Sequence, residues 1–280
     1  MPRKGVKVLR AWIMLLVLAL PLTLTTPITS TANADEFSDA FAAFEIGDYE
    51  TALKIWRSLA DQGDAVSQYN LGVMYANGEG VERDVKEAAR LYRLAADQGY
   101  VKAQYNLAQR YYDGEGVERD LKESARLYHL AAMQGLAEAQ YSLALMNEHG
   151  EGVERDLNEA ARLYRLAAEQ GLAEAQYNLG VMYENGKGVK RDVQEAALLY
   201  RLAAEQGLSV ALFNLGGLYY NTQGMERNVK EAAEFYRLAA MQGYSKAQYN
   251  LGAMYAKGEG GLSRLGKGLY VVRPCGCEWC

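Results

Sequence analysis

Residues 100–135 read YVKAQYNLAQRYYDGEGVERDLKESARLYHLAAMQG, and residues 136–171 read LAEAQYSLALMNEHGEGVERDLNEAARLYRLAAEQG. The two stretches have the same length and share their glycines, most of their apolar positions and the loop string GEGVERD. Units of this kind follow one another without a gap over most of the chain. A fixed period of 36 residues is typical of a solenoid, in which each unit packs mainly against its neighbours.

The repeats divide the chain into four parts. Residues 1–34 form a leader, residues 35–63 a shorter hairpin, residues 64–260 the repeats, and residues 261–280 a divergent tail that we expect to be disordered. The units run from Asp64 to Gly99, Tyr100 to Gly135, Leu136 to Gly171, Leu172 to Gly207 and Leu208 to Gly243, followed by a partial copy from Tyr244 to Gly260.

Each unit has the pattern of a helical hairpin. In the first unit, residues at three- and four-residue steps place one stripe along a helix, namely Ser67, Gln68, Leu71, Met74 and Tyr75. Gly78 suits the left-handed turn that closes this helix. No proline occurs between Asp35 and Arg273, as a run of helices requires. We therefore predict an all-α fold.

The second helix of each unit begins with a predicted capping box. The Asp84 carboxylate is placed to accept from the first turn, and Glu87 is placed to reach back to the cap. The same spacing recurs at Asp120/Glu123, Asp156/Glu159, Asp192/Glu195 and Asn228/Glu231. This second helix carries Ala88, Leu91, Tyr92, Ala95 and Ala96 and ends at Gly99.

These motifs resemble the Sel-1-like repeat family, a branch of the tetratricopeptide-like helical repeats. The resemblance rests on Ala103-Gln104-Tyr105-Asn106-Leu107, Gly114-Glu115-Gly116-Val117, Asp120, and Tyr128 followed by Ala131-Ala132-Met133-Gln134-Gly135, and it covers Asp64 to Gly260. Residues 35–63 resemble the opening hairpin of such proteins, with Trp56 in the place of Tyr92. The resemblance implies a right-handed superhelix of antiparallel helix pairs and a role as a scaffold or adaptor of the bacterial cell envelope.

The leader has the features of a secretory signal. A basic start precedes the apolar run Ala11 to Leu20, and Ala32-Asn33-Ala34 has the small-residue pattern of a cleavage site after Ala34. We expect export to the periplasm or beyond, with an uncleaved anchor as the alternative. Cleavage would leave 26 basic against 35 acidic side chains, a net charge of −9. This charge argues against nucleic acid or an anionic membrane as the main partner.

The end of the chain departs from the pattern. All three cysteines lie there, at Cys275, Cys277 and Cys280, so no disulfide is predicted within the repeats. A disordered tail with free thiols is favoured over a metal site. The last first-helix lacks a second helix in the sequence that follows, which suggests a truncation and possible self-association at this end, because solenoid ends need a polar cap.

Candidate partner-binding residues lie on the first helices. Positions equivalent to 66 and 73 vary from unit to unit and include Lys102, Gln109, Glu138 and Val181. Between them runs a polar ladder of Asn70, Asn106, Asn178, Asn214 and Asn250, with Ser142 in the third unit. An asparagine amide can both donate to and accept from a bound peptide. The alternatives are that the varied positions are merely solvated and that each asparagine bridges helices within the array.

No catalytic, cofactor or metal site is predicted. His129 takes an exposed place that arginine fills in other units, and His149 lies near a loop. The rival function is a small-ligand binder or weak hydrolase of the penicillin-binding type, prompted by secreted relatives of the repeat family. Those relatives carry a cysteine pair in each repeat, and a Ser-x-x-Lys nucleophile motif is also absent here. A protein or peptide partner of unknown identity is therefore preferred.

Overall fold

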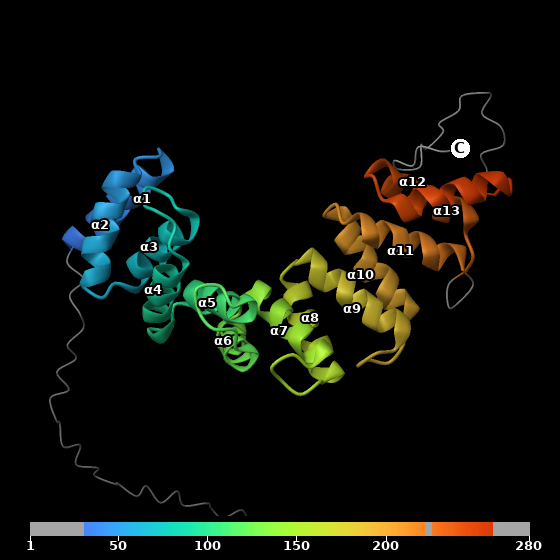
Figure 1. Ribbon diagram of the computed structural model, residues 1–280. Helices are drawn as coiled ribbons and strands as arrows, with labels where there is room; N and C mark the ends of the chain where they lie inside the picture. Colours follow the sequence, from blue (N-terminus) through green and yellow to red (C-terminus); the bar gives the residue numbers. More distant parts are fainter. Residues whose placement is uncertain (1–30, 222–225, 260–280) are drawn as a thin grey trace, which may run out of the picture.

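The computed structural model describes residues 31–221 and 226–259, and within these ranges all regular structure is helical. The helices are α1 (Thr31–Glu45), α2 (Tyr49–Asp61), α3 (Ala65–Asn77), α4 (Val85–Asp97), α5 (Val101–Asp113), α6 (Leu121–Met133), α7 (Ala137–His149), α8 (Leu157–Glu169), α9 (Ala173–Asn185), α10 (Val193–Glu205), α11 (Ser209–Tyr220), α12 (Val229–Met241) and α13 (Ser245–Ala256). Each helix packs against the next one in the chain, along a curved path (Figure 1). The predicted all-helical solenoid is confirmed.

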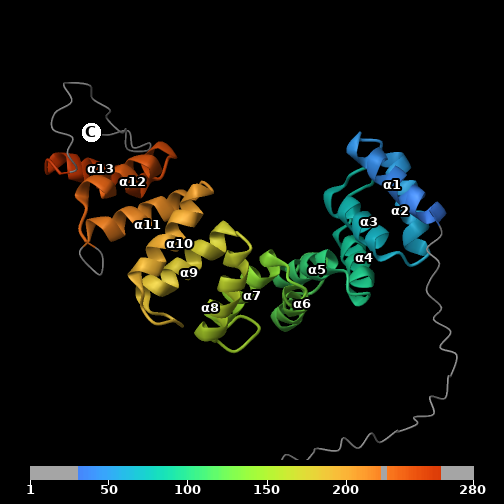
Figure 2. The same cartoon turned by 180° about the vertical axis from the view of Figure 1, so that it is seen from behind.

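The two ends of the array are far apart. In the view from behind, the pair α1–α2 and the pair α12–α13 lie at opposite ends of the arc (Figure 2). Contacts between helices are dominated by neighbours in sequence, as expected of units that stack one after another.

The second helix of each unit begins at the predicted cap. The Asp84 carboxylate accepts from the N–H groups of Lys86 and Glu87 at 3.0 Å. The other half of the predicted capping box, in which Glu87 bonds back to Asp84, is wrong. Glu87 instead accepts from Arg90 at 2.6 and 2.8 Å, and the N–H of Asp84 donates to the carbonyl of Tyr75 at 2.9 Å. Because the end of the first helix already takes this N–H, the glutamate is released to pair on the helix surface.

Two glycines shape the loop between the helices. Gly78 closes α3 with a φ of 76°, as predicted. In the next unit, a Cβ on Gly116 would lie 2.1 Å from the carbonyl oxygen of Val85. The loop therefore lies directly on the start of the preceding unit's second helix, where only glycine fits. This contact fixes how successive units stack.

The core of each unit forms where its two helices cross. A Cβ on Gly72 would lie 2.8 Å from the ring of Tyr92, so the missing side chain makes room for the aromatic ring. Leu71, Met74, Leu91 and Tyr92 are buried together with the predicted alanines. In the opening hairpin Trp56 is buried in the corresponding place, as the sequence suggested.

Several predictions fall at or beyond the edges of the described residues. The cleavage point after Ala34 lies in the first turns of α1, and residues 1–30 lie outside the described part, as do the cysteines of the tail. Export and cleavage stay predictions. Within residues 31–221 and 226–259, no helix combines the length and the apolar character needed to cross a membrane.

The last described helix is less covered than its counterparts. Tyr249 on α13 is 78% exposed, whereas the equivalent tyrosines of the first four units are half-buried. Tyr255 is also exposed. Self-association through this end stays a prediction.

Candidate functional site

The first helices present a continuous face between their buried stripes. Lys102, Gln109 and Glu138 are exposed on it and Val181 is half-buried, so four predicted partner-binding positions are accessible. Gln109 already donates to the hydroxyl of Tyr105 at 3.1 Å. The groove face, as we call it, consists of the residues equivalent to 66, 69, 70, 73 and 77 of the first unit.

The asparagine ladder runs along this face and links neighbouring units. Asn178 donates to the hydroxyl of Tyr164 at 3.2 Å, and Asn214 donates to the hydroxyl of Tyr177 at 3.4 Å. In both cases the tyrosine belongs to the preceding unit. These amides therefore have an internal role, which was the alternative interpretation of the ladder, while contact with a partner stays a prediction.

The first member of the ladder differs from the rest. Asn70 is 9% exposed, and its side-chain nitrogen has no hydrogen-bond partner. The preceding hairpin offers Trp56 where later units offer a tyrosine, and the indole nitrogen, also without a partner, can only donate. Two donors thus occupy the place of a donor and an acceptor.

Burial of these tyrosines perturbs their ionisation. Burial raises the pKa of Tyr92 to about 12, although a hydrogen bond from Asn106 acts in the opposite direction. Burial also raises the pKa of Tyr200, and its hydrogen bond to Glu184 adds to the effect. These two tyrosines of the second helices are therefore neutral hydrogen-bonding groups at ordinary pH.

A second ladder, of glutamines, was not recognised from the sequence. Each unit from the first to the fourth has a buried glutamine, at positions 68, 104, 140 and 176. Its side-chain nitrogen donates to the carbonyl eight residues earlier at 3.2–3.3 Å. Its side-chain oxygen accepts from a glutamine thirty residues later at 2.8–2.9 Å. The signal was present, because every full unit ends in Gln-Gly. The ladder is interrupted in the fifth unit, where Leu212 replaces the glutamine, and Gln248 in the partial copy again donates to the carbonyl of Ala240 at 3.3 Å.

A row of arginine–tyrosine pairs joins the second helix of each unit to the first helix of the next. Arg57 donates to Tyr75 at 2.9 Å, and the same pairing, eighteen residues apart, occurs at Arg93–Tyr111, Arg165–Tyr183 and Arg201–Tyr219. At one junction both partners change, to His129 and Asn147. The two changes are eighteen residues apart in the sequence, a spacing that gains meaning only from the stacking of the helices.

The altered junction borders a pocket, as do the intact Arg57–Tyr75 and Arg93–Tyr111 pairs. A pocket of about 360 Å³ is lined by Lys122, Arg126 and His129 on one side and by Leu143 and Asn147 on the other. Asn147 turns back to donate to the carbonyl of Leu143 at 2.9 Å. His129 is exposed, as predicted.

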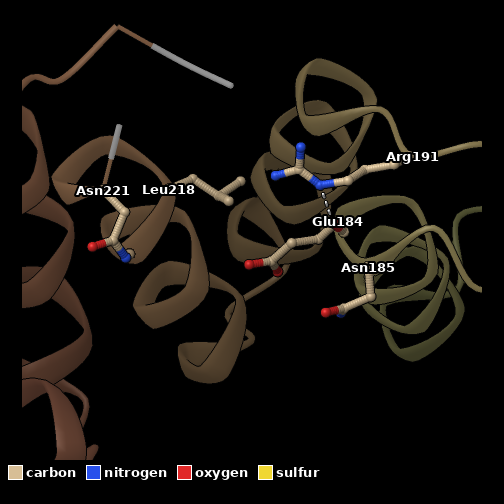
Figure 3. A pocket seen from close by; sticks show the side chains of 6 residues that line it. Glu184, Asn185, Arg191, Leu218 and Asn221 are labelled. Carbon is tan, nitrogen blue, oxygen red and sulfur yellow. Dashed lines mark hydrogen bonds between the residues drawn. The ribbon is translucent and has the colours of Figure 1, made fainter. Parts of the chain in front are cut away.

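Another pocket opens at the loop end of the groove face. It measures about 210 Å³ and lies between the ends of α9 and α11. Figure 3 shows Glu184 and Asn185 facing Leu218 and Asn221 across it, with Arg191 at its edge. Gly217 lines this pocket, and the equivalent position of the first four units holds valine, glutamine or leucine. The missing side chain contributes to this space.

Arg191 holds the loop beside this pocket. Its Nε donates to the carbonyl of Glu184 at 3.0 Å (Figure 3), and the Glu184 carboxylate accepts from Tyr200 at 2.6 Å. The pocket wall is thus fixed by bonds within the fourth unit. Across the described residues, no group of three or more histidine, cysteine, aspartate or glutamate side chains is arranged to hold a metal ion.

Comparison with known families agrees with this geometry. The Sel1 repeat matches residues 45–64, 65–100, 101–136, 137–172, 173–208, 209–244 and 245–270. The chain belongs to the Sel1 repeat family. Sel1 repeat proteins are generally protein-interaction scaffolds, and their all-helical fold is typically non-enzymatic. The first matched segment assigns the second half of the opening hairpin to the repeats as well.

Two solved structures share both sequence and fold with this Sel1 repeat protein. One is c5321, a protective antigen of uropathogenic Escherichia coli strains, with 35% identity over 82% of this chain and a TM-score of 0.78. This chain covers 50% of that protein. The other is a Sel1 repeat protein from Oxalobacter formigenes, with 33% identity, a TM-score of 0.69 and coverage of 79% of this chain and 91% of that one. No curated protein matches the sequence.

Proposed function

We propose that this Sel1 repeat protein is a non-enzymatic scaffold of the bacterial cell envelope that binds a protein or peptide on the concave face of its solenoid. The observation that carries the proposal is the contrast within the first helices. The same buried stripe recurs in every unit, while the accessible positions differ, as Lys102, Glu138 and Val181 illustrate. Packing needs the former, and only the latter can distinguish one partner from another.

The ladder asparagines fit the same role. Asn178 and Asn214 are half-buried, and each is held by a tyrosine hydroxyl of the preceding unit. An amide oriented in advance loses little side-chain entropy when it meets a peptide backbone. Each asparagine would then both bridge units and present its remaining polar atom to a partner.

Photo-crosslinking in the native cell envelope tests the proposal. A photoreactive residue is placed in turn at Lys102, Gln109, Glu138 and Val181, with Glu169 on α8 as the control position. An arginine of the second helices, such as Arg93, would be a poor control position because its side chain donates to Tyr111 of the next unit. We expect one protein to be captured from the groove positions and to be absent from the control. Equal capture at all positions, or none, would contradict binding on this face.

The envelope location has its own test. N-terminal sequencing of the mature protein from the periplasmic fraction should give Asp35 as the first residue. Recovery of the intact leader in the cytoplasm would contradict export and leave the scaffold role to be judged by crosslinking alone.

A further inference from the structure

One loop of the array has the opposite charge to the equivalent loops of the first three units. In the first three units the loop reads GEGVERD, and in the fourth, at residues 186–192, it reads GKGVKRD. Lys187 and Lys190 replace two glutamates, so the loop changes from a net charge of −2 to +2. The chain as a whole is acidic, with a formal net charge of −5.

The basic loop keeps the backbone of the acidic ones. Gly186 and Gly188 have φ values of 67° and 66°, close to those of the equivalent glycines in the first unit. A Cβ on Gly188 would lie 2.1 Å from the carbonyl oxygen of Leu157, so this loop also lies directly on the preceding unit. The two lysines, both exposed, are therefore presented on a fixed frame.

The repeat predicts a third cation beside the lysines, on the other side of the unit boundary. At two other boundaries an arginine pairs with a glutamate thirty-two residues later, as Arg83 does with Glu115 and Arg227 with Glu259. The residue thirty-two positions after Arg155 is Lys187. An attractive pair is thus replaced by two like charges, which is unfavourable unless an anion joins them.

The acids that flank the two lysines and Arg155 accept hydrogen bonds from other groups. Within the described residues, no carboxylate forms an ion pair with Arg155, Lys187 or Lys190 at the distances found elsewhere in the array. Asp156 and Asp192, which flank the patch, accept from the N–H groups of the helices that they cap. Glu148 and Glu184 accept from the hydroxyls of Tyr164 and Tyr200.

We propose that this basic patch, formed by Arg155, Lys187, Lys190 and Arg191, binds a short acidic peptide segment of the partner; the proposal rests on the scaffold function above. Arg191 also borders the 210 Å³ pocket at Gly217, which has room for one partner side chain beside the cations. The patch therefore lies at the loop end of the groove face.

Charge favours a short acidic segment over an extended polyanion. A membrane surface or a nucleic acid presents negative charge over a wide area, and the acidic loop of the preceding unit, residues 150–156, would repel it. A short peptide spans only the basic loop with Arg155 and does not extend along the rest of the acidic loop of the preceding unit. Such a contact is expected to fix the position of the partner and to speed its association.

Binding of a synthetic peptide tests the proposal. The probe is a fluorescent peptide with six glutamates, and its affinity for the full mature chain is measured by anisotropy at two salt concentrations. The variant K187E/K190E restores the loop sequence of the first three units, which fold with it, so loss of binding cannot be attributed to unfolding. The control variant K86E/K230E makes the same change in net charge at two exposed positions on α4 and α12.

We expect K187E/K190E to weaken binding by about tenfold and K86E/K230E by less than about twofold, with the effect of the loop lost at high salt. Equal affinity of K187E/K190E and the parent chain would overturn the proposal. Tighter, loop-dependent binding of anionic lipid vesicles or of an oligonucleotide would also overturn it, in favour of a polyanion site. Crosslinking at Val181 separates the two proposals, because capture of a partner without peptide binding leaves the scaffold function intact and removes only the acidic segment.

Discussion

The side-chain nitrogen of Gln98 donates a 2.8 Å hydrogen bond to the side-chain oxygen of Gln68, which is 5% exposed. Gln68 in turn donates to the carbonyl of Ala60 at 3.2 Å. One buried amide thus connects α2, α3 and α4, with both of its polar atoms satisfied. A buried polar group of this kind stabilises the array only while its partners remain in place.

Removing one glutamine of the ladder should therefore be costly. Gln140 donates to Ala132 at 3.3 Å and accepts from Gln170 at 2.8 Å. We expect Q140L to lower the free energy of unfolding by about 1–3 kcal/mol, because Gln170 and the carbonyl lose their partner. Urea unfolding followed by circular dichroism measures the change. The matched variant L212Q extends the ladder toward Gln242 and should leave stability unchanged or raised; the expectation fails if Q140L is as stable as the parent.

Two glycines at equivalent helix positions should respond oppositely to alanine. A Cβ at Gly72 would lie 2.8 Å from Tyr92, whereas a Cβ at Gly252 would meet nothing within 4 Å. G252A should stabilise α13 by up to about 1 kcal/mol through helix propensity. G72A should be destabilising by about 1 kcal/mol, at the low end for overpacking, because Ala108 and Ala144 occupy this position in other units. Thermal unfolding compares them, and equal stabilisation by both would refute the steric argument.

Restoring the arginine–tyrosine pair at the altered junction should couple two substitutions. In N147Y the ring would enter the 360 Å³ pocket, and in H129R a guanidinium would reach its hydroxyl, as Arg165 reaches Tyr183 at 2.7 Å. We expect the free energy of unfolding of the double variant to exceed the value given by adding the two single-variant effects by about 0.5–1 kcal/mol. A double-mutant cycle in urea measures this coupling, and additive effects would show that the pair does not form.

Alkaline pH should destabilise the array. The pKa of Tyr92 is raised to about 12 in the folded chain from an ordinary value of 10, so the folded state holds the proton more tightly. This contribution is complete below pH 10 and is lost as the pH rises through 12, on the order of 2 kcal/mol. Absorbance of tyrosinate, recorded together with circular dichroism, should show that buried tyrosines such as Tyr92 ionise only as the helices unfold. Y92F should flatten the decline between pH 10 and 12, and an unchanged decline would contradict its assignment to Tyr92.

The fold was predictable because packing imposes the same residues on every unit. The sequence predicts the end of α3 from Gly78 and the start of α4 from Asp84, and both lie there in the structure. It also predicts the buried face of α4 from Leu91 and Tyr92, which are buried. Interactions between units were harder to predict. The bonds Gln98–Gln68 and Arg93–Tyr111 join residues thirty and eighteen positions apart, and their spacing has no meaning until the stacking of helices is known. The failed half of the capping box has a similar cause, since the acceptor that displaced Glu87 lies at the end of another helix.

The candidate site was predictable only in part. Varied positions on the first helices indicated an accessible face, and Lys102, Gln109 and Glu138 are indeed exposed. Whether a given asparagine is free for a partner depends on the neighbouring unit, as the contrast between Asn70 and Asn178 shows. The pocket at Gly217 arises from an absent side chain, which a pattern of residue types does not reveal.

The charge reversal at Lys187 has a consequence for how a partner finds its place. An array of identical units would offer a ligand several equivalent alignments, each shifted by one period, and binding would be a mixture of slipped complexes. A basic loop in one unit removes that translational degeneracy, because only one alignment brings acidic residues onto it. In the proposed complex, the basic loop therefore determines which unit each part of the partner contacts.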